Sequence, residues 1–185
     1  MPMLRPTEVS RNGLLQIAQR EAFVPVAYPD GHFDEAKTKP RWSDGFGDNS
    51  AKEGDTISFK DALVKFKAAV AERTAYVLKK VKGDITQQQL DALVSLYYQG
   101  GNKKLLPVVR EMNRGDIGAA GALFKADSMA TNAHGEYKPG LKKRREREHD
   151  IFTNGDYGDI GWVWKYDGDP SLGRRERYEI TEEDL

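Results

Sequence analysis

The chain has 185 residues, and its 29 basic and 29 acidic side chains cancel. With 38% hydrophobic residues it can form a core, and it lacks the low hydrophobicity and high net charge that favour wholesale disorder. It has no cysteine, which excludes disulfides, thiolate metal sites and a cysteine nucleophile. The apolar runs are far shorter than the roughly 20 residues of a membrane helix. Residues 1–10 lack the apolar block of a secretory signal, so none is expected.

Charge is distributed unevenly along the chain. Residues 153–185 contain nine acidic and four basic side chains, so this end has a net charge of −5 and the preceding body +5. A mildly cationic body suits a polyanion such as nucleic acid or bacterial cell wall. Ordinary surface charge explains the asymmetry equally well.

The first fifty residues predict one helix followed by short strands. Ser10 is a candidate N-cap, apolar residues then recur near helical spacing, and Pro25 cannot continue a helix. We therefore expect a helix ending near residue 23. Residues 24–50 are rich in glycine, proline and aromatic residues, which is typical of short strands and turns, with the first strand at 24–28 and the last at 43–47.

The next hundred residues are predicted to be helical. Ser58 begins a helix that Gly83 ends, and Thr86 with Gln89 forms a capping box for a helix that closes at residues 100–101. Weaker helices are expected at 103–113 and 116–126. Pro139 is a good first-turn residue for a last helix reaching to about residue 152.

Together the elements predict an α+β fold with a small β-hairpin lobe, a larger helical lobe and a cleft between them, where a ligand would bind. Residues 1–153 form the main domain. Residues 154–185 contain aromatic residues between glycines, and we interpret them as an irregular or hairpin extension with an acidic end. We expect this extension to pack on the helical lobe.

Two carboxyl groups are the first candidates for chemistry. Glu21 ends the predicted first helix, and Asp30 follows nine positions later, beyond the first strand. A carboxylic acid that donates a proton and a facing carboxylate that stays ionised are the requirements of glycoside hydrolysis. With 29 acidic residues in the chain, such a spacing also arises by chance.

Two further motifs are weak when each is taken alone. Residues 43–48 read Ser-Asp-Gly-Phe-Gly-Asp, where alternate glycines allow close approach of a substrate but a plain surface hairpin fits as well. Residues 140–148 read Gly-Leu-Lys-Lys-Arg-Arg-Glu-Arg-Glu. They suit a helix face with internal ion pairs or a nucleic-acid patch, although acidic residues interrupt the patch and no aromatic platform accompanies it.

In this order, the motifs resemble the phage-type (T4-like) lysozymes and endolysins of glycoside hydrolase family 24. That family has a glutamate closing its first helix, an aspartate nine positions later and a Thr-x-Gly-Tyr-Gly-His strand, matched here by Glu21, Asp30 and residues 43–48. Its central helix resembles residues 86–95, and its Gly-Leu-x-x-Arg-Arg-x-x-Glu block resembles residues 140–148. The resemblance covers about residues 12–153.

The chain departs from the family pattern at the third catalytic position. Ser43 replaces the threonine, and Asp48 replaces the histidine. The stretch after Asp30 is longer than usual, so Thr38 is a weaker rival to Ser43. The tryptophan usually found before the last helix is missing around residues 127–128.

The resemblance implies a muramidase that cleaves the β-1,4 bond between N-acetylmuramic acid and N-acetylglucosamine of peptidoglycan. It implies that Glu21 is the general acid and that Asp30 with Ser43 positions the attacking water. Arg144 of the last helix is expected to form a salt bridge with Glu21.

Two more residues each have two possible interpretations. Phe46 and Gln99 are candidates for lining the sugar groove, with a core aromatic and a helix end as their respective alternatives. The three histidines, at positions 32, 134 and 149, show no ligand spacing, so neither a metal nor a cofactor is expected.

Peptidoglycan is the expected partner of a monomeric enzyme, with no nucleic acid and no stable membrane insertion. The protein is expected in the host cytoplasm before its release to the wall, or in the phage virion. Two alternatives stay open at this point. One is a lytic transglycosylase acting on the same bond, and the other is a non-catalytic wall-binding or virion module on a lysozyme scaffold.

Overall fold

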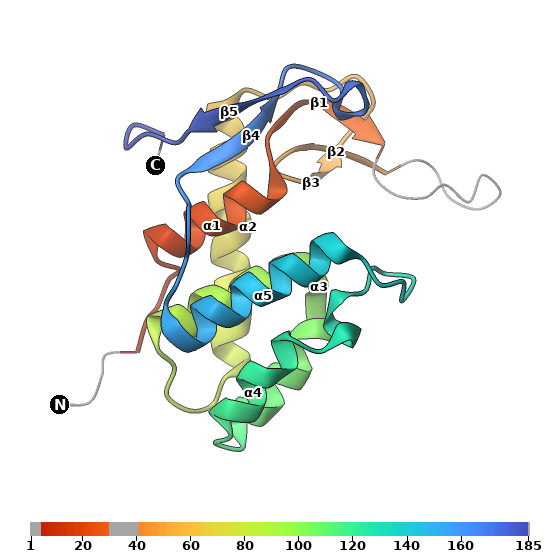
Figure 1. The fold of residues 1–185 in the computed structure, drawn as a ribbon. Helices are drawn as coiled ribbons and strands as arrows, with labels where there is room; N and C mark the ends of the chain where they lie inside the picture. The colour runs from red at the N-terminus through yellow and green to blue at the C-terminus, as the bar shows by residue number, and fades with distance from the viewer. Residues whose placement is uncertain (1–4, 30–40, 185) are drawn as a thin grey trace. The chain divides into compact units, whose positions relative to one another are not determined.

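The computed structural model describes residues 5–29 and 41–184, and the chain divides into two compact units. The helical unit comprises Met1–Gln16 and Val70–Asp159, and the sheet unit comprises Ile17–Ala69 and Ile160–Leu185. The chain passes from one unit to the other within helix α1 (Arg11–Glu21), within helix α2 (Phe59–Lys80) and after Asp159. Each unit therefore joins segments that are distant in the sequence (Figure 1).

The helical unit is built around α3 (Gln87–Asn113), α4 (Ile117–Phe124) and α5 (Pro139–Asn154), with a short 3-10 helix at Asp127–Ala130. The predicted capping box begins α3: the Gln89 amide donates to Thr86 Oγ1 at 3.4 Å, and the Thr86 amide donates to Gln89 Oε1 at 3.0 Å. These bonds satisfy two amides that a helix start leaves without partners. Pro139 occupies the first turn of α5, as predicted.

A glycine divides α3 without ending it. The sequence predicts a stop at residues 100–101 and a new helix at 103–113, whereas the structure contains one element with a kink at Gly101. Gly101 has φ 58° and ψ −160°, a conformation that is nearly restricted to glycine. The two predicted helices are therefore consecutive segments of α3.

The helical core lies where α3, α4 and α5 pack against one another. The Phe124 and Phe152 rings lie 5.3 Å apart between centroids. The apolar residues predicted on one face of α3 include Leu90, Leu93 and Val94, and all three are fully buried. Their burial holds α3 and α5 together, which places the polar residues of both helices close to one another.

The sheet unit contains a three-stranded antiparallel sheet in the order β1-β2-β3, formed by β1 (Val24–Pro29), β2 (Trp42–Gly45) and β3 (Asp48–Ala51). The strand predicted at 43–47 is wrong in its extent, because β2 ends at Gly45 and the next two residues form the turn to β3. Gly45 has φ 57° and Gly47 has φ 81°. Such left-handed backbone bends a strand into a turn.

Four phenylalanine rings form the core of the sheet unit. Phe23, Phe46, Phe59 and Phe66 contact one another in tilted or edge-to-face pairs, with centroid distances of 5.0 to 5.8 Å. The cluster joins the start of β1, the turn after β2 and the first part of α2. It holds the end of α1 and the β2–β3 turn in one compact body.

The C-terminal extension is a β-hairpin of β4 (Trp162–Tyr166) and β5 (Arg175–Glu179). The hairpin belongs to the sheet unit, which also contains the first part of α2, and the expectation that the extension packs on the helical lobe stays a prediction. Both main-chain polar groups of Phe23 are bonded to β4: its amide donates to the Trp164 carbonyl at 2.7 Å, and its carbonyl accepts from the Tyr166 amide at 2.9 Å. Phe23, directly before β1, is thus paired with β4 (Figure 1).

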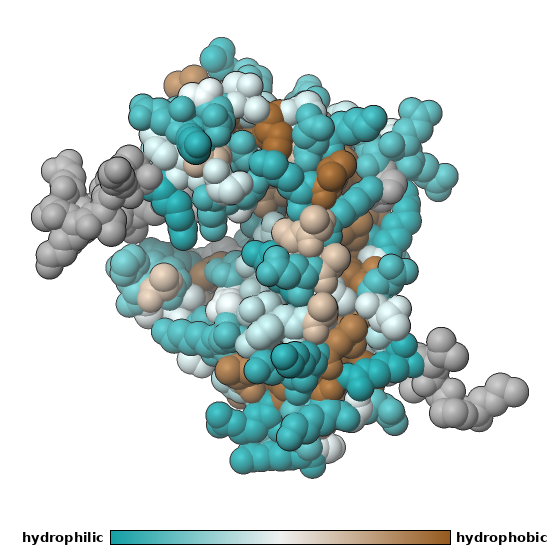
Figure 2. Space-filling view, turned by 180° about the vertical axis from the view of Figure 1, so that it is seen from behind, coloured by the Kyte–Doolittle hydropathy of each residue, from teal (hydrophilic) through white to brown (hydrophobic). Residues whose placement is uncertain are grey.

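The surface is predominantly polar, in keeping with a mean hydropathy of −0.70. Figure 2 shows a face on which hydrophilic residues predominate and hydrophobic ones occupy small areas. Within residues 5–29 and 41–184, none of the helices combines the length and the apolar character that a bilayer crossing requires.

Candidate active site

Glu21 is the last residue of α1 and is half-buried. A methyl group built on Gly47 would lie 3.9 Å from Glu21 Oε2, so the carboxyl group faces the glycine turn between β2 and β3. Both residues belong to the sheet unit. The structure therefore brings together the predicted acid and the glycine motif that the sequence places 26 positions apart.

The residue after Glu21 has unusual backbone geometry. Ala22 has φ 58°, and it is the only non-glycine residue with positive φ among those that the structure describes. Left-handed backbone costs roughly 1–2 kcal/mol in a residue with a Cβ atom. Here the left-handed conformation of Ala22 turns the chain from the end of α1, at Glu21, into β1. Strain of this kind is frequent beside functional groups.

Ser43 lies on β2 and is fully buried. Its hydroxyl donates to Asn49 Oδ1 at 2.7 Å, across the β2–β3 turn. Since a serine hydroxyl has one proton and two lone pairs, this bond leaves Ser43 able to act only as an acceptor. Asp30 and the rival Thr38 lie outside the described residues.

Asp48, at the position of the family histidine, forms an ion pair with Lys65 of α2 at 2.8 Å. Burial acts to raise the pKa of Asp48, but the bonds from Lys65 and Ser50 outweigh it and the pKa falls below its usual range. The same ion pair raises the pKa of Lys65. The ion pair thus favours the charged form of Asp48, and the Lys65 ammonium group neutralises that charge.

Asp44 is a second, less satisfied carboxylate of the turn. Its side chain is 3% exposed, and no partner for Oδ1 is found among the described residues. Burial raises the pKa of Asp44 and Lys65 opposes the rise. The β2–β3 segment therefore combines a carboxyl group whose pKa is lowered with one whose pKa is raised.

A buried ionic cluster lies in the helical unit. Glu148 Oε1 accepts from Arg144 Nε at 3.1 Å and from Ser95 Oγ at 2.7 Å, and Glu148 Oε2 lies 3.0 Å from Arg145 Nη1. The cluster joins α3 to α5 and holds the Arg144 guanidinium in one orientation. The predicted pairing of Arg144 with Glu21 stays a prediction.

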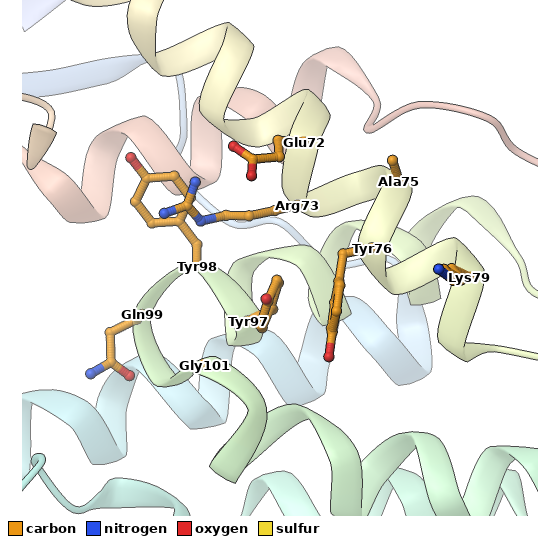
Figure 3. Close-up of a pocket in the computed structure, with 9 residues that line it drawn as sticks. All are labelled: Glu72, Arg73, Ala75, Tyr76, Lys79, Tyr97, Tyr98, Gln99 and Gly101. Carbon is orange, nitrogen blue, oxygen red and sulfur yellow. The ribbon is translucent and has the colours of Figure 1, made fainter.

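Gln99 lies near the end of the first segment of α3, where its side-chain oxygen accepts from Arg145 Nη2 at 2.7 Å. It lines a pocket of about 640 Å³ whose other walls come from α2 and α3. In the close-up, Arg73 lies across the Tyr98 ring, and Tyr76 stacks on Tyr97 (Figure 3). These pairs cover ring faces that a ligand would otherwise contact.

Phe46, a candidate for lining the sugar groove, lies in the core of the sheet unit. Its side chain is 2% exposed and packs against three other phenylalanines. The core alternative is therefore the one that the structure shows, because the turn directs this ring into the sheet unit.

Sequence reasoning missed two partners in these clusters. Nothing in the local pattern around Lys65 indicates its ion pair with Asp48. The one usable signal in the sequence is Asp48 itself, because an acidic residue at the family's histidine position favours a basic partner. Arg145 was treated only as part of a charged helix face. Its complete burial follows from the double-arginine motif together with Glu148 three positions later.

No group of three acidic or histidine side chains in residues 5–29 and 41–184 is arranged to hold a metal ion.

The fold and these motifs define a lysozyme-like enzyme, and comparison with known proteins agrees. The phage lysozyme family model matches residues 18–148. A phage endolysin from Acyrthosiphon pisum secondary endosymbiont phage 1 is 32% identical over 150 residues, covering 79% of this chain and 98% of the relative.

Solved structures show the same similarity. The endolysin of Escherichia coli O157:H7 phage FAHEc1 has 27% identity and a TM-score of 0.68, covering 82% of this chain and 97% of that one. The muramidase domain of SpmX from Asticaccaulis excentricus has 25% identity and a TM-score of 0.67, covering 80% and 98%. The chain belongs to the phage lysozyme family. It is a glycoside hydrolase that degrades peptidoglycan in phage lysis.

Proposed function

We propose that Glu21 is the general acid of this hydrolase. It donates a proton to the oxygen of the β-1,4 bond between N-acetylmuramic acid and N-acetylglucosamine. The observation that carries the proposal is the position of its carboxyl group, at the end of α1 and facing Gly47 of the glycine turn. The left-handed Ala22 and the Phe23–β4 hydrogen bonds hold the chain directly after it.

Asp30 is proposed as the carboxylate that activates the attacking water, with Ser43 accepting a hydrogen bond from the same water. The acceptor role suits Ser43 because its own proton is directed at Asn49. Arg144 is proposed as a supporting residue, and the cluster with Glu148 and Ser95 supports this by orienting its guanidinium.

Glu21→Gln tests the acid. An amide cannot donate the required proton, so cleavage of purified cell wall in a zymogram is expected to fall by at least about 100-fold, while the thermal unfolding midpoint stays close to that of the wild type. Glu53→Gln is the matched control, because it makes the same change at an exposed glutamate of the sheet unit. Normal clearing by Glu21→Gln would refute the assignment.

Product analysis tests the reaction type. Water attack on the face opposite the leaving group inverts the anomeric configuration and requires carboxyl groups roughly 6.5–9.5 Å apart. We expect hydrolysed, inverted products by mass spectrometry and by proton NMR of freshly cleaved glycan. An anhydro sugar, which contains one water less, would instead identify a lytic transglycosylase.

We also propose that the protein is a monomer. It accumulates in the host cytoplasm until it is released to the wall, and the name of the curated endolysin relative supports action on the wall from inside the cell. Proteomics of purified phage particles and of infected cells tests the location. Enrichment in the particles would favour a virion enzyme instead. Light scattering of the purified chain tests the oligomeric state.

A further inference from the structure

One face of the C-terminal hairpin combines aromatic residues with arginines. The register pairs Trp164 with Arg177 and Tyr166 with Arg175. Because side chains alternate across a strand, Trp162, Trp164 and Tyr166 share one face with both arginines and with Glu179, which pairs with Trp162. We call the three aromatic residues and the two arginines the aromatic–arginine face.

The opposite face of the hairpin anchors it to the sheet unit. Val163 is fully buried, and the Tyr178 ring packs on Phe59 with centroids 4.8 Å apart. The backbone of β4 is bonded to Phe23. The described contacts of Val163, Tyr178 and the β4 backbone thus anchor the hairpin to the sheet unit.

The side chains of the aromatic–arginine face form a continuous ladder. The Arg177 guanidinium lies 4.5 Å from the Trp162 ring centroid, and the Arg175 guanidinium lies 4.4 Å from that of Trp164. The two indoles meet edge to face at 5.4 Å. The three aromatic residues are half-buried and both arginines are exposed. Arg177 also forms an ion pair with Glu179 at 2.7 Å, and Arg175 donates to the Tyr166 hydroxyl at 3.2 Å. Stacking and these bonds restrict the long arginine side chains, and their other planar donors form a defined array.

We propose that the aromatic–arginine face is a second binding site of this enzyme, for the glycan strand of peptidoglycan. The apolar C–H groups of a sugar ring contact indole and phenol rings, while guanidinium donors bind acetamido oxygens, the amide oxygen of the lactyl group and the carboxylates of the stem peptide. The strand of five residues extends for about 17 Å, which accommodates several sugar units. The choice of polymer rests on the proposed function.

Charge distinguishes a glycan from other polymers. Residues 160–185 contain seven acidic and four basic side chains. A net negative segment repels nucleic acid and anionic membranes, whereas a sugar polymer with scattered carboxylates needs only the local arginines. The hairpin also lies outside the family match, which ends at residue 148. The proposed site is therefore an addition to the shared fold, tied through Phe23 to the segment that follows Glu21.

The test measures binding separately from cleavage. In a Glu21→Gln background, co-sedimentation with purified sacculi compares Trp162→Ala/Trp164→Ala and Arg175→Gln/Arg177→Gln with Glu176→Gln, a control on the opposite face of the hairpin. We expect at least about fivefold weaker binding from both double variants, and a change below about twofold from the control. With Glu21 restored, turnover of sacculi should fall while turnover of a short soluble oligosaccharide stays unchanged.

Folding of each variant is checked by circular dichroism. If the tryptophan pair is unfolded, the arginine pair decides the outcome, together with indole NMR shifts of Trp162 and Trp164 on titration of soluble glycan fragments into the Glu21→Gln protein. Unchanged sacculus binding in folded variants, or a loss seen equally with DNA or phosphatidylglycerol vesicles, would overturn the proposal. Because binding is measured without catalysis, an error in the Glu21 assignment would appear only in the zymogram.

Discussion

Removal of the Glu148 carboxylate should destabilise the helical unit severely. Glu148 is fully buried, and the side chains of Arg144 and Arg145 are 7% and 0% exposed. Glu148→Ala leaves both guanidiniums in the interior without this carboxylate and deprives Ser95 Oγ of its acceptor. Breaking a buried ion pair by removing one partner costs roughly 3–5 kcal/mol. In a chain of this size, such a loss lowers the unfolding midpoint by roughly 6–20 °C.

Urea denaturation of Glu148→Ala and the wild type measures the loss directly as a change in the free energy of unfolding. Glu146→Ala is the matched control, because Glu146 is on the same helix but exposed, and its effect should stay within about 0.5 kcal/mol. Glu148→Gln, which keeps an acceptor for Ser95 but not the charge, should fall between the two. A loss below about 1 kcal/mol for Glu148→Ala would refute the reasoning that this carboxylate compensates two buried cations.

Two further predictions concern the sheet unit. Ala22→Gly should raise the free energy of unfolding by about 1 kcal/mol, since glycine relieves the left-handed strain at φ 58°; destabilisation in urea would contradict it. The pKa of Asp48 is lowered in the folded state, so its ion pair with Lys65 stabilises the fold above the ordinary carboxyl pKa of 3.8, and the benefit is lost as the pH falls through the lower folded value. The pKa of Lys65 is raised, so the benefit is complete below 10.5 and is lost as the pH rises through the higher folded value. The destabilisation caused by Asp48→Asn should therefore be largest between about pH 4 and 10. Urea denaturation of the variant and the wild type within and beyond this range measures it. A loss of stability that does not vary with pH, or that is smallest in this range, would contradict the prediction.

The helices could be predicted because their signals are local. Thr86, Gln89 and Pro139 act within one turn of their own backbone, so the starts of α3 and α5 can be recognised from a few neighbouring residues. The kink at Gly101 was misread as a stop, since a glycine pair cannot reveal whether the next turn resumes. Packing of Leu105 and Val108, both fully buried, keeps the second segment in place.

The strands and the extension were predicted less well because their partners are distant. The residues of β2 do not show where pairing with β1 ends, so the turn at 46–47 was assigned to a strand. The aromatic residues between glycines predict an irregular or hairpin extension, but the hydrogen bonds of the hairpin to Phe23 join residues separated by about 140 positions. A pattern within the 32 residues of the extension does not identify such a partner.

The candidate site divides in the same way. The sequence by itself determined the order and spacing of Glu21, the glycine motif and the double-arginine block, and these identify the family because they are linear features. Only the tertiary structure decided that Phe46 is a core ring, that the Ser43 hydroxyl is bound to Asn49, and that Glu148 neutralises buried arginines. The physical reason is that spacing determines which face of an element a side chain occupies, whereas its burial and its hydrogen-bond partners depend on the segments that folding brings against that face.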